Sequence, residues 1–577
     1  MPNPFYQPLS SEGVPDFDAI SPEHYREAFE RAFAEHDEEI RAIVANYAAP
    51  TFANTLEALE RSGSLLKRVD AVFSNLTSAH TNDVLEALDL EISPQYAVHQ
   101  SRIYSNPELF ARVRAVEQAA ESLEPEQAQL LLETHKAFVR AGAELDDAAR
   151  ARVDAINEEL ATLTTQFGQN VLRDTNSFEL ALEEGDDTAG LPEFVLAAAR
   201  AEAAARGREE GYLFTLSRSS ITPFLQYSNR RGLREQIYQA YTRCGQSAVD
   251  NHAIIRRIVS LRAERARLLG FATHADYMLD DRMAQQPENA LELLQKVWEP
   301  CRVRVAEEAA DLQARIHADG DSFGLQPWDW HFYTEKIRQE RYSLDENTIK
   351  PYFKLENVRD GAFEVARKLY GITFHERPDL PRYHPDVIVY EAREADGSKI
   401  GIFLFDFYMR PSKRSGAWMS AYRSQSKLDG HVQPVIVNCC NFPKTDPCLL
   451  GLDEVRTLFH EFGHGLHGLL SDVRYEGLSG TNVKQDFVEL PSQIMEHWAI
   501  EPEVLRSYAR HCESGEVMPE EMISKLRAAQ RFNQGFATSE YLAACFLDMA
   551  WHGKAGEVAD DVDEFESQLM RDLGMIA

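Results

Sequence analysis

The chain has 577 residues, of which 93 are Asp or Glu and 60 are Lys or Arg, so its formal net charge is −33 at pH 7. This charge would repel nucleic acid and anionic membranes, and we expect neither as a partner. No stretch approaches the roughly 20 apolar residues of a membrane-spanning helix, and the N-terminus lacks the pattern of a secretory signal. The seven cysteines are scattered without a CxxC pair, which predicts reduced thiols in a cytoplasmic protein.

The first part of the chain is predicted to be helical. Ser21 is a suitable N-cap, and apolar residues recur at helical spacing over 25–47 until Pro50 ends the pattern. A second apolar stripe follows Asp147, and the Ala-rich segment 192–207 predicts another helix. We interpret these stripes as core-facing surfaces.

The periodicity changes after Pro385. The segments 387–393 and 399–407 are rich in β-branched and aromatic residues, and Asp396-Gly397 between them is typical of a hairpin turn. A third short strand is predicted at 434–439. The sequence therefore predicts a small sheet in an otherwise helical protein.

The segment 453–467 contains an HExxH motif, which follows a possible helix cap at Asp453. His460 and His464 lie four residues apart on one helical face, about 6 Å apart along the axis, so both imidazoles can bind one ion. Glu461 is rotated by about 100° from His460, so it can avoid the metal and reach the attacking water. We therefore predict a zinc site with Glu461 as the general base.

A catalytic zinc ion usually has a third protein ligand. His467 shares the helical face, but it lies about 10 Å from His460 along the axis, so we interpret it as a pocket residue. The other possible ligands are downstream carboxylates: Asp472, Glu476, Asp486, Glu489 and Glu496. The run 486–498 predicts a second helix with Pro491 near its start, and spacing alone does not choose between Glu489 and Glu496.

Three motifs together carry a family resemblance: HEFGHGLH (460–467), SGTN (479–482) and DFVELPSQ (486–493). With them the chain resembles the thimet-oligopeptidase family (M3) of zinc metallopeptidases. Within this family it is most similar to the bacterial peptidyl-dipeptidases, through QPWDW (326–330), HPDV (384–387), GAWM (416–419) and EHWA (496–499). In the family the Glu of the FVE triplet is the third metal ligand, so the resemblance implies Glu489.

The resemblance implies a mainly α fold, a large helical clamshell with a deep central channel and a small β-sheet next to the HExxH helix. We expect residues 1–250 to form an N-terminal helical region along one wall of the cleft, and residues 251–577 to form the zinc peptidase region. The family pattern continues beyond Ala577 with a His- and Gly-rich loop and paired tyrosines, so we expect a C-terminally truncated chain.

The implied function is that of a metallopeptidase (EC 3.4) with one Zn²⁺ per chain, acting as a monomer on short unstructured peptides and releasing C-terminal dipeptides. A cation that binds the peptide carboxylate would explain this carboxypeptidase-like cleavage, and Arg410, Lys413 and Arg414 are weak candidates. Two alternatives remain open: an oligopeptidase of the same family that cuts internally, and a truncated, inactive remnant that binds zinc and peptide. A structural helical protein with an accidental HExxH pattern would bind no stoichiometric zinc.

Overall fold

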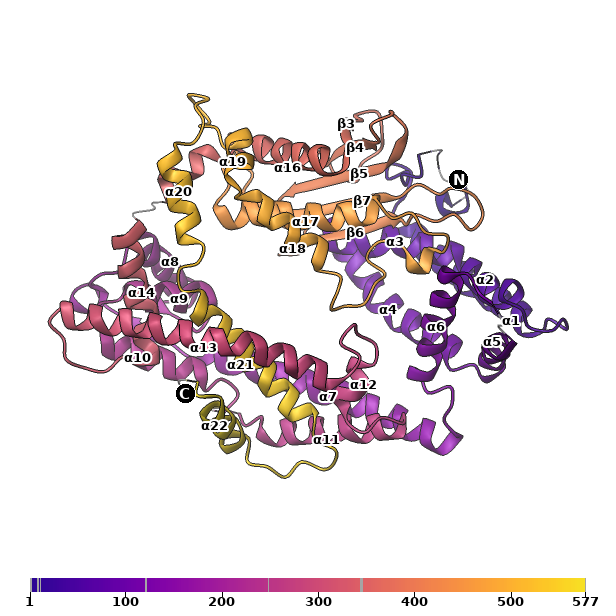
Figure 1. Ribbon diagram of the computed structural model, residues 1–577, viewed down its shortest axis with the longest axis horizontal. Helices are drawn as coiled ribbons and strands as arrows, with labels where there is room; N and C mark the ends of the chain where they lie inside the picture. The colour runs from indigo at the N-terminus through magenta and orange to yellow at the C-terminus, as the bar shows by residue number, and fades with distance from the viewer. Residues whose placement is uncertain are drawn as a thin grey trace. The chain divides into compact units, whose positions relative to one another are not determined.

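The computed structural model describes residues 3–7, 10, 12–119, 122–246, 249–342 and 346–575, and the chain forms two compact units (Figure 1). The first unit comprises Met1–Glu144 and Asp345–Ile523, and the second comprises Leu145–Leu344 and Ser524–Ala577. Both units combine segments from either side of residue 250. The two regions that we expected from the sequence, 1–250 and 251–577, therefore do not coincide with these units.

The first unit combines helices with a five-stranded sheet. Its helices are α1 (Glu23–Val44), α2 (Phe52–Arg61), α3 (Ser64–Ala79), α4 (Asp83–Tyr104), α5 (Pro107–Ala119), α6 (Pro125–Arg140), α15 (Glu346–Ile349), α16 (Leu355–Tyr370), α17 (Leu452–Leu469), α18 (Leu490–Ala499) and α19 (Pro502–Tyr508). Its strands are β3 (Thr373–Glu376), β4 (Ile388–Arg393), β5 (Lys399–Tyr408), β6 (Trp418–Arg423) and β7 (Val435–Phe442). The spatial order is β3-β4-β5-β7-β6, with β5 and β7 parallel and all other neighbours antiparallel.

The sheet of the first unit is buried on both faces because its central strands carry apolar side chains in alternating directions. Ile402 and Leu404 of β5 belong to a core cluster with residues of α1, α3 and α4. Phe403 and Phe405 point to the other face, where their rings pack near Phe462 of α17. The sheet thus lies between the N-terminal helices and α17.

The second unit is almost entirely helical. Its helices are α7 (Asp147–Ser177), α8 (Glu193–Ala205), α9 (Arg218–Tyr227), α10 (Arg231–Thr242), α11 (His252–Leu268), α12 (His274–Leu279), α13 (Pro287–Ala318), α14 (Pro327–Tyr342), α21 (Gln534–His552) and α22 (Val562–Leu573). Its strands β1 (Leu180–Leu182) and β2 (Tyr212–Phe214) form one antiparallel pair. Helix α20 (Glu520–Ala529) spans the boundary between the two units in the sequence.

The predicted mainly helical class with a small sheet is confirmed, and the differences lie at element ends and in two additional strands. Ser21 is not the N-cap of α1, because Pro22 occupies that position and the Ser21 hydroxyl contacts His24 Nδ1 instead. Tyr47 lies beyond the end of α1 and is fully exposed. Strands β3 and β6, at the two edges of the sheet, were not predicted. Across the described residues, no helix is both long and apolar enough to span a membrane.

Candidate functional site

Helix α17 carries the HExxH pattern and begins one residue earlier than its expected cap. Gly451 is the N-cap, and its backbone N–H donates a hydrogen bond of 2.7 Å to Glu454 Oε2. Asp453 therefore lies in the first helical turn, where its exposed carboxylate faces the positive end of the helix dipole. The start of the helix is therefore capped by Gly451 and Glu454 and not, as predicted, by Asp453.

Glycines let α17 pack closely against its neighbours. A Cβ atom on Gly465 would lie 2.1 Å from the Phe403 ring, and one on Gly463 would lie 2.6 Å from the carbonyl oxygen of Pro491. The first contact seats α17 on the sheet, and the second brings the start of α18 against its side. Because Glu489 directly precedes α18, this close packing delivers its carboxylate to the histidines of α17.

Three side chains converge between α17 and α18. Glu489 Oε2 lies 3.2 Å from His460 Nε2 and 3.1 Å from His464 Nε2. All three ligand atoms lie within 4.8 Å of one another. Donors placed tetrahedrally about 2.1 Å from one ion are separated by about 3.4 Å, so these spacings fit a single ion. Two imidazoles and one carboxylate are also a donor set typical of catalytic zinc.

Two neighbouring residues orient these donors. Glu496 Oε1 lies 2.7 Å from His460 Nδ1, so that nitrogen carries the proton and the Nε2 lone pair faces the cluster. Ser492 Oγ donates a hydrogen bond of 2.8 Å to Glu489 Oε2. Spacing in the sequence left Glu489 and Glu496 as equal alternatives, whereas in the structure they contact opposite nitrogens of His460.

Glu461 lies beside the cluster without joining it. Its side chain is 5% exposed, and its Oε2 atom has no hydrogen-bond partner among the described residues. Burial raises the pKa of Glu461 to about 7, and the nearby Glu489 carboxylate adds to the rise while His460 opposes it. A buried carboxyl group with one free oxygen is a chemically suitable proton acceptor next to a metal site.

The remaining residues that the sequence analysis named as possible ligands lie elsewhere. His467 is outside the converging group, and its ring lies near that of Phe487. Asp472 forms an ion pair with Lys427, and Glu476 forms one with Lys67. Asp486 is likewise not part of the converging group.

The three possible carboxylate-binding cations after β5 differ in their environments. Arg410 and Lys413 both bind the buried carboxylate of Asp406, at 2.6 and 2.9 Å. They are structural, which rules them out as anchors for a peptide. Arg414 is exposed, and its guanidinium lies over the ring of Trp418.

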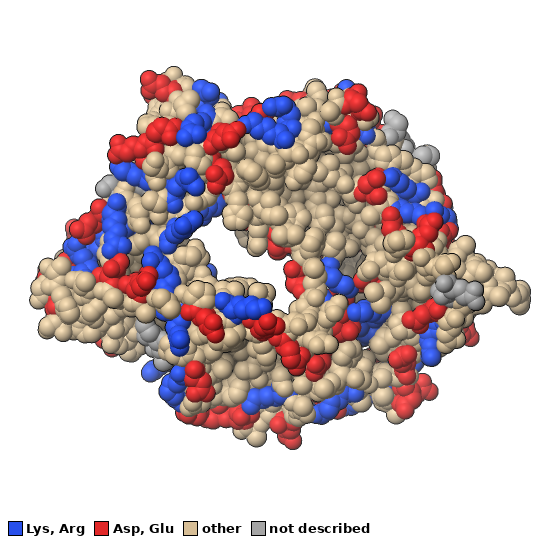
Figure 2. All heavy atoms as spheres, in the orientation of Figure 1, with Lys and Arg blue, Asp and Glu red and all other residues tan. Residues whose placement is uncertain are grey.

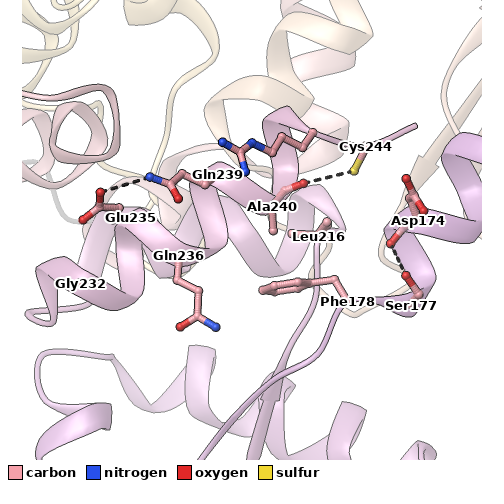
Figure 3. Close-up of a pocket in the computed structure, with 11 residues that line it drawn as sticks. Asp174, Ser177, Phe178, Leu216, Gly232, Glu235, Gln236, Gln239, Ala240 and Cys244 are labelled. Atoms are coloured by element: carbon pink, nitrogen blue, oxygen red, sulfur yellow. Dashed lines mark hydrogen bonds between the residues drawn. The ribbon is translucent and has the colours of Figure 1, made fainter. Parts of the chain in front are cut away.

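A separate pocket of about 640 Å³ lies in the second unit between α10 and the end of α7 (Figure 3). In this view the Phe178 ring lies below α10, and Glu235 and Gln239 point toward each other. Gln239 Nε2 donates a hydrogen bond of 3.1 Å to Glu235, and Ser177 Oγ donates one of 3.0 Å to the Asp174 carbonyl. The pocket contains none of the converging metal donors.

The part of the visible face over α17 and α18 differs from the rest of that face. Figure 2 shows acidic and basic side chains intermixed over most of this face, with few charged side chains over α17 and α18. A surface with few charged side chains beside a metal-binding group suits an uncharged peptide backbone better than it suits a polyanion.

Comparisons with known proteins agree with this chemistry. The profile of Peptidase family M3 matches residues 224–575. Dipeptidyl carboxypeptidase of Escherichia coli (strain K12) is 45% identical over 562 residues, which cover 96% of this chain and 82% of that protein. Oligopeptidase A of Salmonella typhimurium (strain LT2) is 34% identical over 568 residues, which cover 96% of this chain and 83% of that protein.

Proposed function

Because this chain belongs to peptidase family M3, we propose that it is a zinc-dependent peptidyl-dipeptidase that releases dipeptides from the C-termini of short peptides. The observation that carries the proposal is the convergence of two imidazoles and one carboxylate within 4.8 Å, next to a buried glutamate. The 45% identity to a dipeptidyl carboxypeptidase supports the dipeptide product.

The proposed metal ligands are His460, His464 and Glu489. When bound, zinc would supply Lewis-acid chemistry, lowering the pKa of water and polarising the scissile carbonyl. Glu496 holds the Nδ1 proton of His460, and this keeps the Nε2 lone pair directed at the cluster. Ser492 restrains the Glu489 carboxylate by donating a hydrogen bond from its hydroxyl group to Oε2.

Glu461 is the proposed general base. Its carboxylate would accept a proton from the attacking water and return it to the leaving amine, a role typically worth about 10²–10⁴-fold in rate. Burial excludes bulk water from this carboxylate, and its free Oε2 can form the required hydrogen bond. The group thus lies beside the proposed ligands with one oxygen free to accept a proton.

We also propose that the protein acts as a monomer in the cytoplasm. All seven cysteines are free thiols, which supports a reducing compartment. Short peptides are the proposed substrates because the family consists of peptidases and the chain's acidity disfavours anionic macromolecules.

The proposal is tested by mass spectrometry of the products of an N-acetylated pentapeptide incubated with the zinc-loaded protein. We expect the free C-terminal dipeptide and the acetylated tripeptide, with the rate reduced about 10²–10⁴-fold in Glu461→Gln. Products cut at other bonds would favour the oligopeptidase alternative, which the 34% identity to oligopeptidase A keeps open. An intact peptide would contradict the proposed activity.

A further inference from the structure

The pocket of the second unit, which we call the α10 groove, follows one face of a single helix. The lining residues from this helix and its C-cap recur at helical spacing: Gly232, Glu235, Gln236, Gln239, Ala240 and Arg243. Their face is about 16 Å long, because each residue adds 1.5 Å to a helix. The other lining residues come from the end of α7, from Leu216 and from Cys244. The volume of about 640 Å³ is in the range of sites that bind small ligands.

The two sides of the α10 groove are fixed to the body of the second unit. On the face of α10 away from the groove, Arg234 Nη2 lies 2.9 Å from the buried carboxylate of Asp329. After α10, the backbone N–H of Gly245 donates a hydrogen bond of 2.7 Å to Asp174 Oδ2 of α7. Leu216 belongs to the core cluster of this unit. The groove is therefore present before any ligand binds.

Glu235 and Arg243 are two charged groups of the groove that lack an oppositely charged partner among the described residues. Glu235 accepts a hydrogen bond only from the uncharged amide of Gln239, at 3.1 Å. In contrast, Arg230 and Arg231 at the start of α10 form ion pairs with carboxylates. Glu235 and Arg243 are eight residues apart, about 12 Å along the helix axis, so they do not neutralise each other. Figure 3 shows Glu235 and Cys244, the residue after Arg243, toward opposite ends of α10.

This separation of charges selects the kind of ligand. A molecule with an ammonium group at one end and a carboxylate at the other would satisfy both residues, whereas a dianion or a dication would meet a like charge. An extended peptide spans about 3.3–3.6 Å per residue, so three or four residues match the distance from Glu235 to Arg243. Between them, the amides of Gln236 and Gln239 can donate to and accept from a peptide backbone.

We propose that the α10 groove is a second peptide site, which binds peptides of three or four residues through their two free termini. Glu235 binds the terminal ammonium group and Arg243 binds the terminal carboxylate. None of the converging metal donors lines the groove, so the bound peptide is held by its charges and not by the metal centre. Peptides of this length with free termini are also among the products that the proposed dipeptide release would leave.

The test follows the alkylation of Cys244 by iodoacetamide in the zinc-loaded Glu461→Gln protein, with peptide mass spectrometry as the readout. Cys244 is suitable because it lines the groove and is half-buried. We expect tetraalanine with both termini free to slow this reaction in a saturable manner. Its N-acetylated form and its C-terminal amide should each bind about 10-fold more weakly, because each loses one hydrogen bond between charged groups.

Two variants assign the termini to their partners. In Glu235→Gln we expect weaker binding of tetraalanine and no further loss on N-acetylation, because the partner of the ammonium group is gone. In Arg243→Gln we expect the same for the C-terminal amide. Isothermal titration with these peptides and variants should give the same order of affinities, and it decides the question even if Cys244 reacts slowly.

The controls separate the α10 groove from the metal centre and from general charge effects. Cys512, a half-buried thiol of the first unit, should react at the same rate with and without tetraalanine. Glu299→Gln and Arg302→Gln, at exposed positions of α13, should keep the dependence on both termini. Glu489→Ala should still show protection of Cys244. Absence of saturable binding, equal affinity for free and blocked peptides, or protection that is lost in Glu489→Ala would overturn the proposed site.

Discussion

Glu489 and Glu496 show how far individual residues could be assigned from the sequence. They are seven residues apart, and helical periodicity places both near the histidines of α17 without distinguishing them. In the structure Glu489 approaches Nε2 of His460, whereas Glu496 lies 2.7 Å from Nδ1. Residue spacing could not assign them, and only the family resemblance implied Glu489, because the choice depends on the direction in which the His460 ring is turned. That direction is set by tertiary packing.

The contact between Glu496 and His460 predicts a large effect on metal affinity. Glu496→Ala removes the acceptor of the Nδ1 proton, so the ring loses its fixed orientation and some basicity at Nε2. We expect zinc affinity to fall about 10–100-fold, measured by competition with a fluorescent chelator. Glu503→Ala is the control, because Glu503 is exposed and pairs with Lys368. Unchanged zinc affinity in Glu496→Ala would contradict the role of Glu496 in orienting His460.

At the scale of elements, segments with strong periodicity were predicted correctly, whereas the edge strands were missed. The sequence indicated α17 and α18, including Pro491 near the start of α18, and the β4–β5 hairpin with its turn at Asp396-Gly397. It missed β6, whose side chains are mostly half-buried and lack a clear alternation. Both edge strands, β3 and β6, were therefore missed, and only the inner strands were predicted.

The close packing of α17 on α18 predicts that Gly463→Ala is harmful to both fold and site. The added Cβ would lie 2.6 Å from Pro491 O and from Ser492 Cα, so α18 must move away. We expect a loss of about 1–3 kcal/mol in the free energy of unfolding, together with weaker zinc binding. Gly232→Ala in α10 is the control, because its Cβ would meet open space and Ala favours a helix by about 1 kcal/mol. Equal thermal midpoints for the two variants would argue against this packing.

The buried ion pair between β5 and the segment after it predicts a second stability effect. Lys413→Met leaves Asp406 fully buried with one cation fewer, and we expect a loss of about 3–5 kcal/mol in the free energy of unfolding. Lys427→Met breaks an exposed pair with Asp472 and should cost at most about 1 kcal/mol. Urea unfolding of both variants measures the difference, and similar losses would contradict a structural role for Lys413.

At the scale of the whole molecule, the two units are built from segments distant in the sequence. This arrangement could not be predicted, because no low-complexity linker or change of composition marks the boundaries near residues 144, 345 and 523. What the sequence did establish was the class of the fold and the family, since both depend on patterns within short segments.

Each unit contains a buried histidine whose protonation is unfavourable. Burial lowers the pKa of His36 to about 4 in the first unit and the pKa of His274 to about 3 in the second unit. In both cases the charge of a neighbouring histidine lowers the pKa further. An unfolded histidine has a pKa of about 6.5. Below that pH the unfolded chain therefore binds more protons than the folded chain, and stability falls as the pH falls.

This linkage predicts acid destabilisation of the first unit between about pH 6.5 and pH 4, and of the second unit between about pH 6.5 and pH 3. For His36 the expected loss from pH 7 to pH 5 is about 2 kcal/mol in the free energy of unfolding. His36→Asn should reduce the difference between urea unfolding at pH 7 and at pH 5 by about that amount. His375→Asn, at an exposed site, should leave it unchanged. A pH dependence that is identical in His36→Asn and the wild-type protein would contradict the assignment.

Native mass spectrometry of the purified protein would show whether the converging donors form a zinc centre. We expect one zinc ion per chain in the wild-type protein and in Glu461→Gln, because Glu461 lies outside the converging donors. Glu489→Ala should lose the ion, because only the two histidines remain. Zinc retained in full by Glu489→Ala, or absent from the wild-type protein, would contradict the proposed metal centre and the peptidase mechanism built on it.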